Sequence, residues 1–410
     1  MSSNPIDCKG IESLEVYLDR ERVGELQRTA GGARFTYDAS YIKAAEERAI
    51  AFSMPVREKP YDVHGTNLHT FFAGLLPEGL RLQALERGLK TSKDDLFSLL
   101  AAGGSNTVGD VWVKCAEVDD PQDSPLVDPR KLREHSFKEL LAQSLDWEKG
   151  GDSVTVAGVQ PKISAGMISF PLRANSKQRE YILKLSPPEY PKLVENEAFF
   201  MQVARSAGMQ TATVKVVHDS EAESALLVER FDRQVQRMDA GGPLRRLHQE
   251  DACQLLDVYP AEKYRVSLKS IAEALEVCSA PLVERLGLLR LQAFSYLIAN
   301  GDLHAKNVSV YKREGQTRLT PAYDLLSTLP YGDAKLALKL EGRDEDLQRA
   351  HFITFGERLG IRSAATERML NTLVKKLSPW IPRLPEIGLE EKKSRHLARV
   401  MTKRLLDLSA

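Results

Sequence analysis

The sequence predicts an α+β protein with a smaller mixed lobe and a larger helical lobe, preceded by a small N-terminal β/α domain. Apolar and polar residues alternate near the N-terminus, strand-like and helix-like stretches then alternate as far as about residue 228, and helical patterns dominate from residue 249. The 410 residues are 42% hydrophobic and 28% charged, which is typical of globular proteins with a large core. The net charge is zero, so composition gives no global reason to expect a nucleic acid, membrane or acidic partner.

The first domain begins with a strand pattern and continues with helical patterns. Leu14, Val16 and Leu18 alternate with polar residues, and two further strand-like stretches follow at 23–26 and 34–37, which predicts an antiparallel meander. Helical patterns follow between residues 68 and 100 and stop at two glycines. An acidic, proline-containing stretch at 119–125 has the composition of a linker. We therefore divide the chain into an N-terminal domain (1–118), a linker (119–130), a small lobe (131–232) and a helical lobe (233–410).

The cysteines and the apolar runs bear on the cellular compartment. Cys8, Cys115, Cys253 and Cys278 lie far apart and lack the spacing of zinc ligands, so we expect free thiols in a reducing compartment. Residues 1–9 contain no apolar signal region, and the chain has no run of eighteen apolar residues. These patterns favour a cytoplasmic protein without a membrane partner.

The most informative stretch for chemistry is 300–307, which we call the catalytic loop. Asp302 and Asn307 are five residues apart, which is the spacing of the base and the metal-binding residue in kinase catalytic loops. Phosphate transfer needs a carboxylate near the attacking hydroxyl and oxygen ligands for Mg²⁺, so we assign the first role to Asp302 and the second to Asn307 and Asp324. We expect His304 to hold the loop by hydrogen bonds and Lys306 to neutralise the transferring group. The alternative is that Asp302 and Asn307 only cap turns, as these residue types commonly do.

A predicted hairpin near residues 308–323 brings the two metal ligands together. Gly315-Gln316 suits a two-residue loop with glycine at its first central position, and paired residue numbers then sum to 631. Asn307 and Asp324 have this sum. We therefore expect them to face each other at the open end of the hairpin, with about 5 Å between their Cα atoms, and to hold one metal ion from two sides.

A nucleotide site is predicted by two strands of the small lobe. On the strand at 181–186, Lys184 points away from the face that carries Leu183, and we expect it to bind nucleotide phosphates and to pair with Glu197 on the next helix. An exposed strand lysine and a solvated helix carboxylate are the alternatives. The strand near 225–228 runs into polar residues as a hinge would, and backbone groups around Glu229 and Phe231 are expected to bind the adenine edge.

The phosphate cradle is expected at 153–162, a loop that contains Gly158 and Lys162 but neither of the common glycine-rich phosphate motifs. Together with the catalytic loop, this segment makes the chain resemble the HipA family of bacterial serine/threonine kinase toxins. The resemblance is carried by five segments, at 75–79, 156–162, 248–251, 301–307 and 323–325.

The resemblance implies a protein-kinase-like two-lobed fold, the use of ATP and Mg²⁺, and phosphorylation of a protein serine or threonine. Family substrates include aminoacyl-tRNA synthetases, whose modification stalls translation and makes cells dormant and persistent. A HipB-like helix-turn-helix antitoxin is the implied partner, and operator DNA is bound only through the antitoxin complex. The phosphate loop implied by the family consists of Val156, Ala157, Gly158, Val159, Gln160 and Lys162.

The resemblance also implies autophosphorylation of a serine just before the Val-Ala-Gly segment. This chain has Thr155 in that place and Ser153 two residues earlier, so both are candidates. A second departure lies at 257–264, where some members carry a glycine-rich stretch. The basic stretch at 392–404 is either a DNA contact of a repressor complex or a solvated helix face.

Two rival functions stay open. Gly-Asp-Leu-His followed by Asn at this spacing is also similar to aminoglycoside and choline phosphotransferases, although the N-terminal domain and the loop at 156–162 argue against a small-molecule kinase. The other rival is a catalytically silent corepressor of an antitoxin. The complete set of Lys184, Asp302, Asn307 and Asp324 argues against it.

Overall fold

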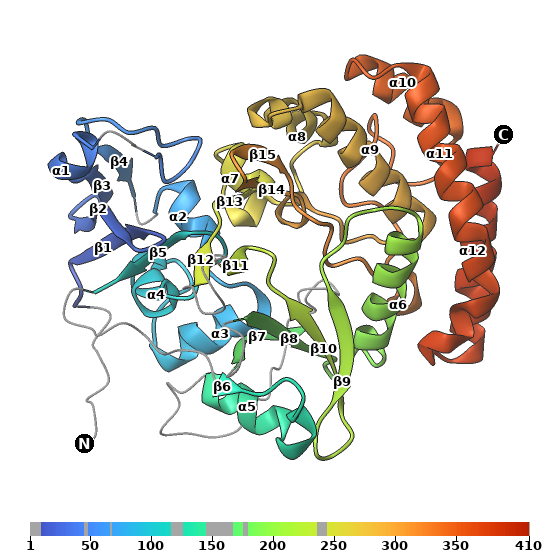
Figure 1. Cartoon of the computed structure of the whole chain (residues 1–410), viewed down its shortest axis with the longest axis horizontal. Helices are drawn as coiled ribbons and strands as arrows, with labels where there is room; N and C mark the ends of the chain where they lie inside the picture. The colour runs from blue at the N-terminus through green and yellow to red at the C-terminus, as the bar shows by residue number, and fades with distance from the viewer. Residues whose placement is uncertain are drawn as a thin grey trace.

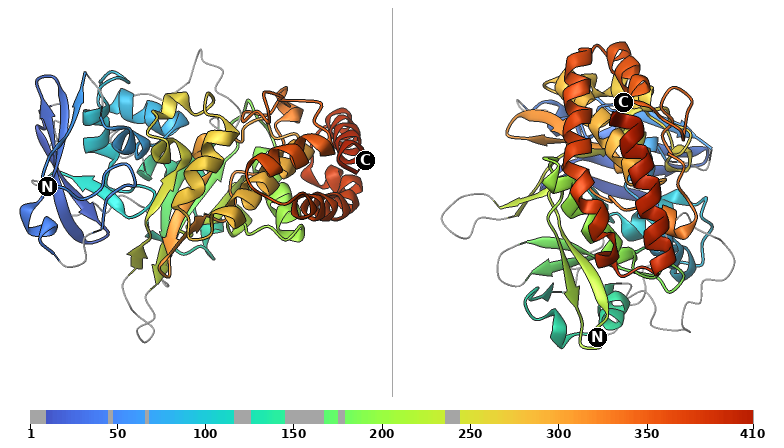
Figure 2. Two further views of the ribbon diagram at one scale, coloured as in Figure 1. Left: turned by 90° about the horizontal axis from the view of Figure 1, so that it is seen from above. Right: turned by 90° about the vertical axis from the view of Figure 1, so that its right-hand side faces the viewer.

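The computed structural model describes residues 10–44, 48–65, 68–115, 126–144, 167–174, 179–235 and 244–409. It confirms the predicted α+β class and the two lobes with a smaller N-terminal domain. The N-terminal domain forms one end of the molecule and the last three helices form the other (Figures 1 and 2). Across these residues no helix is both long and apolar enough to cross a membrane. Residues 119–125 of the expected linker (119–130) and the phosphate loop at 153–162, with both autophosphorylation candidates, lie outside the described residues, and the domain boundaries stay predictions.

The N-terminal domain is built on an antiparallel sheet in the order β4-β3-β2-β1-β5. Its elements are β1 (Ser13–Leu18), β2 (Glu21–Thr29), β3 (Gly32–Tyr37), α1 (Ala39–Ile42), β4 (Tyr61–His64), α2 (Thr70–Gly74), α3 (Gly79–Gly88), α4 (Leu96–Gly103) and β5 (Val111–Lys114). The predicted meander is confirmed, because β1 pairs with β2 and β2 with β3. Leu14, Val16 and Leu18 are all buried, as their alternation predicts. They pack with helix residues such as Phe71 and Leu99 into one core.

The small lobe contains a second sheet in the order β6-β7-β8-β10-β9. Its elements are β6 (Leu126–Val127), η1 (Leu132–Glu134), α5 (Phe137–Ser144), β7 (Ile168–Ala174), β8 (Glu180–Leu185), α6 (Leu193–Ser206), β9 (Val214–His218) and β10 (Ser224–Glu229). Alternation along β8 puts Leu183 in a core with Phe137 of α5, while Ile182 packs with α6 residues on the other face. Figure 1 shows α5 and α6 on opposite sides of this sheet.

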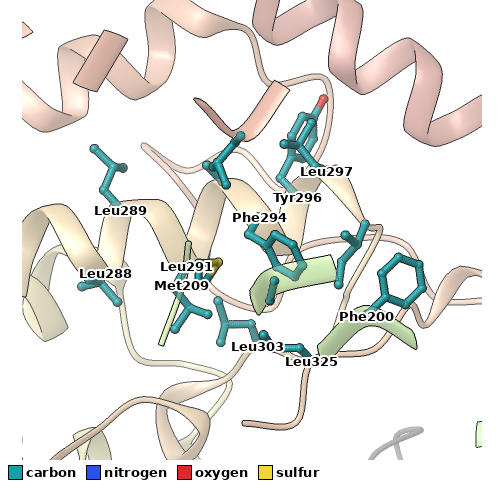
Figure 3. Packing of buried hydrophobic residues seen from close by; sticks show 14 of the residues in the cluster. Phe200, Met209, Leu288, Leu289, Leu291, Phe294, Tyr296, Leu297, Leu303 and Leu325 are labelled. Carbon is teal, nitrogen blue, oxygen red and sulfur yellow. The ribbon is translucent and has the colours of Figure 1, made fainter. Parts of the chain in front are cut away.

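The larger lobe is mostly helical. Its elements are β11 (Arg233–Val235), β12 (Leu244–Arg246), β13 (Gln249–Asp251), α7 (Ala252–Leu255), η3 (Pro260–Glu262), α8 (Leu268–Ala274), η4 (Leu275–Val277), α9 (Pro281–Leu297), η5 (Ala305–Asn307), β14 (Ser309–Arg313), β15 (Gln316–Leu319), η6 (Leu329–Tyr331), α10 (Arg349–Arg358), α11 (Ser363–Leu377), η7 (Ser378–Ile387) and α12 (Glu391–Ser409). The buried face of α9 carries Phe294, which lies near Leu303 and Leu325 of the loops that follow (Figure 3). The core therefore anchors both loops that carry the predicted site.

The hairpin between β14 and β15 forms, but its predicted register is wrong. Arg313 pairs with Gln316, so the loop is Glu314-Gly315 and paired residue numbers sum to 629. Both loop residues have positive φ, 54° and 76°, which is the type I′ turn whose twist matches that of the strands. The ladder also ends at Leu319, so Asn307 and Asp324 lie beyond it and do not face each other as a strand pair.

Two buried clusters of charged side chains join the N-terminal domain to the rest of the molecule. The hinge cluster consists of Arg230, Asp232 and Arg233, which lie between the end of β10 and the first residue of β11. Both arginines donate to the carbonyl of Thr107, at 2.7 and 2.9 Å, and Asp232 accepts a hydrogen bond from the amide of Gly109 at 3.0 Å. The two arginines also pair with Asp232 at 2.6 and 2.7 Å. The domain is therefore fixed at the point where the lobes meet.

The histidine cluster consists of Asp110, His248 and Glu250. Nδ1 of His248 lies 3.1 Å from Asp110 of the N-terminal domain, and Nε2 lies 2.9 Å from Glu250 of β13. Burial acts to lower the pKa of His248, but the two carboxylates outweigh it and raise this pKa to about 10. The imidazole is therefore a cation at neutral pH, and it donates to Glu250 of its own lobe and to Asp110 across the domain boundary.

Candidate active site

The candidate site begins with a buried lysine on β8. Lys184 Nζ lies 2.9 and 3.1 Å from the two carboxylate oxygens of Glu197 on α6, and it also contacts Asp324 of the loop after β15. Burial alone would lower the pKa of Lys184, but Asp324 and Glu197 outweigh it and raise this pKa. The predicted pairing of Lys184 with Glu197 is confirmed. A fixed cation therefore stands between the two lobes.

The catalytic loop follows α9 and is held by its own backbone. Asn300 accepts a hydrogen bond from the amide of Asp302 at 2.9 Å, and the side chain of Asn307 donates to the carbonyl of Asp302 at 3.0 Å. Gly301 is required here, because a Cβ atom would lie 2.7 Å from the carbonyl oxygen of Lys335. Asp302 itself is buried, and its carboxylate accepts a hydrogen bond from Tyr264 at 2.7 Å. These contacts hold Asp302 and Asn307, which are five residues apart in sequence, close together in space.

The two predicted metal ligands line a common cavity. Asn307 uses its amide nitrogen to bond the loop, which leaves its oxygen as the atom that can ligate a cation. Asp324 presents a carboxylate beside Lys184 and has a left-handed backbone, with φ of 54°, which turns the chain sharply after Tyr323. An amide oxygen and a carboxylate are the hard ligands that Mg²⁺ prefers, so the donor set fits that ion.

The cavity between the lobes has a volume of about 330 Å³, within the usual range for small-ligand pockets. It is lined by the residues predicted for nucleotide and metal binding, namely Lys184, Glu229, Phe231, Lys306, Asn307 and Asp324. A second cavity of about 230 Å³ shares Asn307 and Asp324 and adds His304. The structure thus brings together all of the predicted site residues that it describes except Asp302, which is buried on the same loop and lines neither cavity.

His304 and Lys306 make contacts that differ from the expected ones. Nδ1 of His304 is buried without a hydrogen-bond partner among the described residues, and the ring packs edge-on against Tyr264. Burial, aided by Lys263, lowers the pKa of His304 to about 4, so the ring is uncharged at neutral pH. Lys306 donates to Asp251 at 2.7 Å and to the carbonyl of Gly74 at 3.1 Å. The expected loop-holding hydrogen bond of the His304 ring is thus not made through Nδ1, and the phosphate-neutralising role of Lys306 stays a prediction.

Several residues at the site were not predicted. Glu78 and Arg81 of the N-terminal domain line both cavities, and Glu78 pairs with Lys263 at 2.9 Å. Tyr264 follows Lys263 and reaches Asp302. Glu78 lies in one of the segments that carry the family resemblance, so a signal was present for it. Tyr264 lies in the segment where the chain departs from part of the family, and no spacing pattern connects it to Asp302.

Family models match most of the chain. A model described as the HipA-like C-terminal domain matches residues 154–381, and one described as the HipA N-terminal domain matches residues 14–114.

Two relatives and a solved structure extend this likeness. The chain is 29% identical to Y4mE of Sinorhizobium fredii, over 92% of both chains. It is 28% identical to the serine/threonine-protein kinase toxin HipA of Shewanella oneidensis, over 81% of this chain and 79% of the toxin. The solved complex of HipA, HipB and operator DNA from Shewanella oneidensis has a chain with the same fold, at a TM-score of 0.72 and 23% identity, covering 97% of this chain and 96% of that one. With both family models matched in chain order, this protein belongs to the HipA family.

Proposed function

We propose that this protein is an ATP-dependent serine/threonine protein kinase that acts as the toxin of a HipA/HipB-like toxin-antitoxin pair. The observation that carries the proposal is the convergence of Lys184, Asn307 and Asp324 on one cavity beside the loop that bears Asp302. Lys184 binds the nucleotide phosphates, and the backbone near Glu229 and Phe231 binds the adenine edge. Asn307 and Asp324 would hold Mg²⁺, which would supply positive charge to offset that of the phosphates. Asp302 orients the attacking hydroxyl and accepts its proton.

The partner and the substrate are proposed from the relatives. Membership of the HipA family supports a helix-turn-helix antitoxin as partner, with operator DNA bound only through that complex. The protein substrate proposed is a translation component such as an aminoacyl-tRNA synthetase. Ser153 and Thr155 are the proposed autophosphorylation sites, and Val156, Ala157, Gly158, Val159, Gln160 and Lys162 are the proposed phosphate loop.

Intact-mass spectrometry after incubation with Mg²⁺ and ATP tests the proposal. We expect one phosphate adduct that maps to Ser153 or Thr155, and the Ser153→Ala and Thr155→Ala variants identify which. The parent protein is first analysed without ATP, so that phosphate acquired during expression is counted. If neither the chain nor an added aminoacyl-tRNA synthetase gains phosphate while an aminoglycoside or choline does, the small-molecule kinase replaces our proposal. If nothing gains phosphate, the silent corepressor replaces it.

The pairing of Lys184 with Glu197 gives a separate prediction. Replacing Glu197 by Gln keeps the side-chain size but removes the charge that holds the ammonium in place. We expect KM for ATP to rise about tenfold, equivalent to about 1.4 kcal/mol, with a smaller fall in kcat. Steady-state kinetics against ATP measure this. Glu195→Gln is the matched control, because Glu195 lies on the same helix and pairs with the half-exposed Lys192. Equal KM values in the two variants contradict the role of the pair.

A further inference from the structure

Two consecutive residues after η3, Lys263 and Tyr264, form hydrogen bonds to the catalytic loop. The carbonyl of Lys263 accepts a hydrogen bond from the amide of Ala305 at 3.1 Å. The hydroxyl of Tyr264 donates to Oδ1 of Asp302 at 2.7 Å, and the Tyr264 ring lies edge-on to His304 with 5.0 Å between the ring centroids. The loop is thus held at its carboxylate, at its imidazole and at its backbone by one short segment.

In the hydrogen bond between Tyr264 and Asp302, Tyr264 is always the donor and Asp302 the acceptor. Burial, with a further contribution from Asp302, raises the pKa of Tyr264 far above its ordinary value, so the phenol stays protonated and acts as the donor. A hydrogen bond to a carboxylate is shorter and stronger than one between neutral groups. It therefore restrains rotation of the Asp302 carboxylate about its Cβ–Cγ bond.

The same segment is held from its other side by the N-terminal domain. The side chain of Lys263 pairs with Glu78 at 2.9 Å. Five residues before Tyr264, the hydroxyl of Tyr259 donates to the carbonyl of Leu68 at 2.9 Å. The ion pair of Lys263 with Glu78 holds the residue directly before Tyr264, and so keeps the Tyr264 hydroxyl at a defined position. Tyr259 lies five residues away, and its contact with Leu68 does not reach the catalytic loop.

We propose that Tyr264 is a positioning residue, which holds the carboxylate of Asp302 in the orientation that phosphate transfer requires. The inference rests on the proposed kinase function, because that function makes Asp302 the group that meets the attacking hydroxyl. Tyr264 touches neither nucleotide nor substrate in this assignment and acts only through Asp302.

Tyr264→Phe tests the proposal, because it keeps the ring against His304 and removes only the hydroxyl. We expect kcat for phosphate transfer to fall about tenfold while KM for ATP stays within about twofold. Tyr259→Phe is the matched control. It removes a hydroxyl from the same segment, but one that bonds Leu68 rather than the catalytic loop, so both constants should stay at the parent values.

Three outcomes overturn the proposal. An unchanged kcat in Tyr264→Phe means that the hydroxyl does not position Asp302. A raised kcat means that Tyr264 occupies the place of the substrate hydroxyl and blocks it. A KM for ATP that rises along with a falling kcat means that the variant has disturbed the nucleotide site as a whole.

Amide hydrogen exchange makes the test independent of catalysis. If the parent transfers no phosphate, the proposed function fails, but the contact can still be measured. We expect the peptide that covers the catalytic loop to exchange about tenfold faster in Tyr264→Phe than in Tyr259→Phe, because the loop has lost a contact to its carboxylate. Equal exchange rates in the two variants overturn the positioning role.

Discussion

Asp302→Asn is expected to lower phosphate transfer about a thousandfold or more while leaving the fold intact. The side chain keeps its size, and the amide oxygen still accepts the hydrogen bond from Tyr264, so the loop has little reason to move. What is lost is the carboxylate that we propose orients the attacking hydroxyl and accepts its proton, and such groups commonly contribute 10² to 10⁴ in rate. Phosphate incorporation from ATP measures the loss, and thermal unfolding and ATP binding show that the remainder of the site persists.

Glu262→Gln is the control for removing one carboxylate from this part of the molecule. Glu262 lies on η3, close in sequence to Tyr264, but pairs with the exposed Arg265. We expect this variant to keep its activity. If Asp302→Asn retains more than a tenth of the parent activity, Asp302 is not the group that orients the hydroxyl.

The sequence predicted the parts of the site that depend on local periodicity. Alternation along β8 was enough to turn Lys184 away from the core that holds Leu183, and helical spacing was enough to place Glu197 within reach of it. The five-residue spacing of Asp302 and Asn307 also had a local cause, since the Asn307 side chain bonds the Asp302 carbonyl. Such contacts join neighbours in sequence or adjacent elements, so short patterns can reveal them.

The rest depended on contacts that no local pattern encodes. The predicted hairpin register was wrong because Glu314 adopts a positive φ, and the sequence gives no sign of this for a residue other than glycine or asparagine. The contact between Tyr264 and Asp302 spans 38 residues, and that between Lys306 and Gly74 spans 232. The packing of the N-terminal domain against the catalytic loop decides both the environment of Lys306 and that of Lys263. This packing cannot be predicted from the sequence of either domain taken separately.

His248→Gln is expected to destabilise the protein by about 3 kcal/mol at pH 7. The change leaves Asp110 and Glu250 without their shared cation, and both carboxylates are almost completely buried, with 1% and 0% of their side chains exposed. Removing one partner of a buried charge pair typically costs 3–5 kcal/mol. Urea unfolding at pH 7 measures the loss.

The pH dependence of this loss has a definite sign. The folded protein holds the proton on His248 with a pKa of about 10, against an ordinary value of 6.5 in the unfolded chain. Its stabilising contribution is therefore complete below about pH 6.5 and is lost as the pH rises toward 10. The difference between parent and His248→Gln should shrink between pH 7 and pH 9.5. His64→Gln, at an exposed position on β4, is the control, and we expect it to change stability by less than about 0.5 kcal/mol. A difference that stays constant across this range contradicts the assignment.

The N-terminal domain spans the joint between the two lobes, which bears on the turnover rate of the proposed kinase. Its Thr107 carbonyl accepts from the arginines of the hinge cluster, its Phe71 carbonyl accepts from Gln254 of the large lobe, and α3 packs against β7 of the small lobe. A wide opening of the lobes has to break at least one of these buried contacts. Release of spent nucleotide should therefore be slow and strongly temperature-dependent, and mutations that loosen the N-terminal domain should speed it even though they lie far from the phosphates.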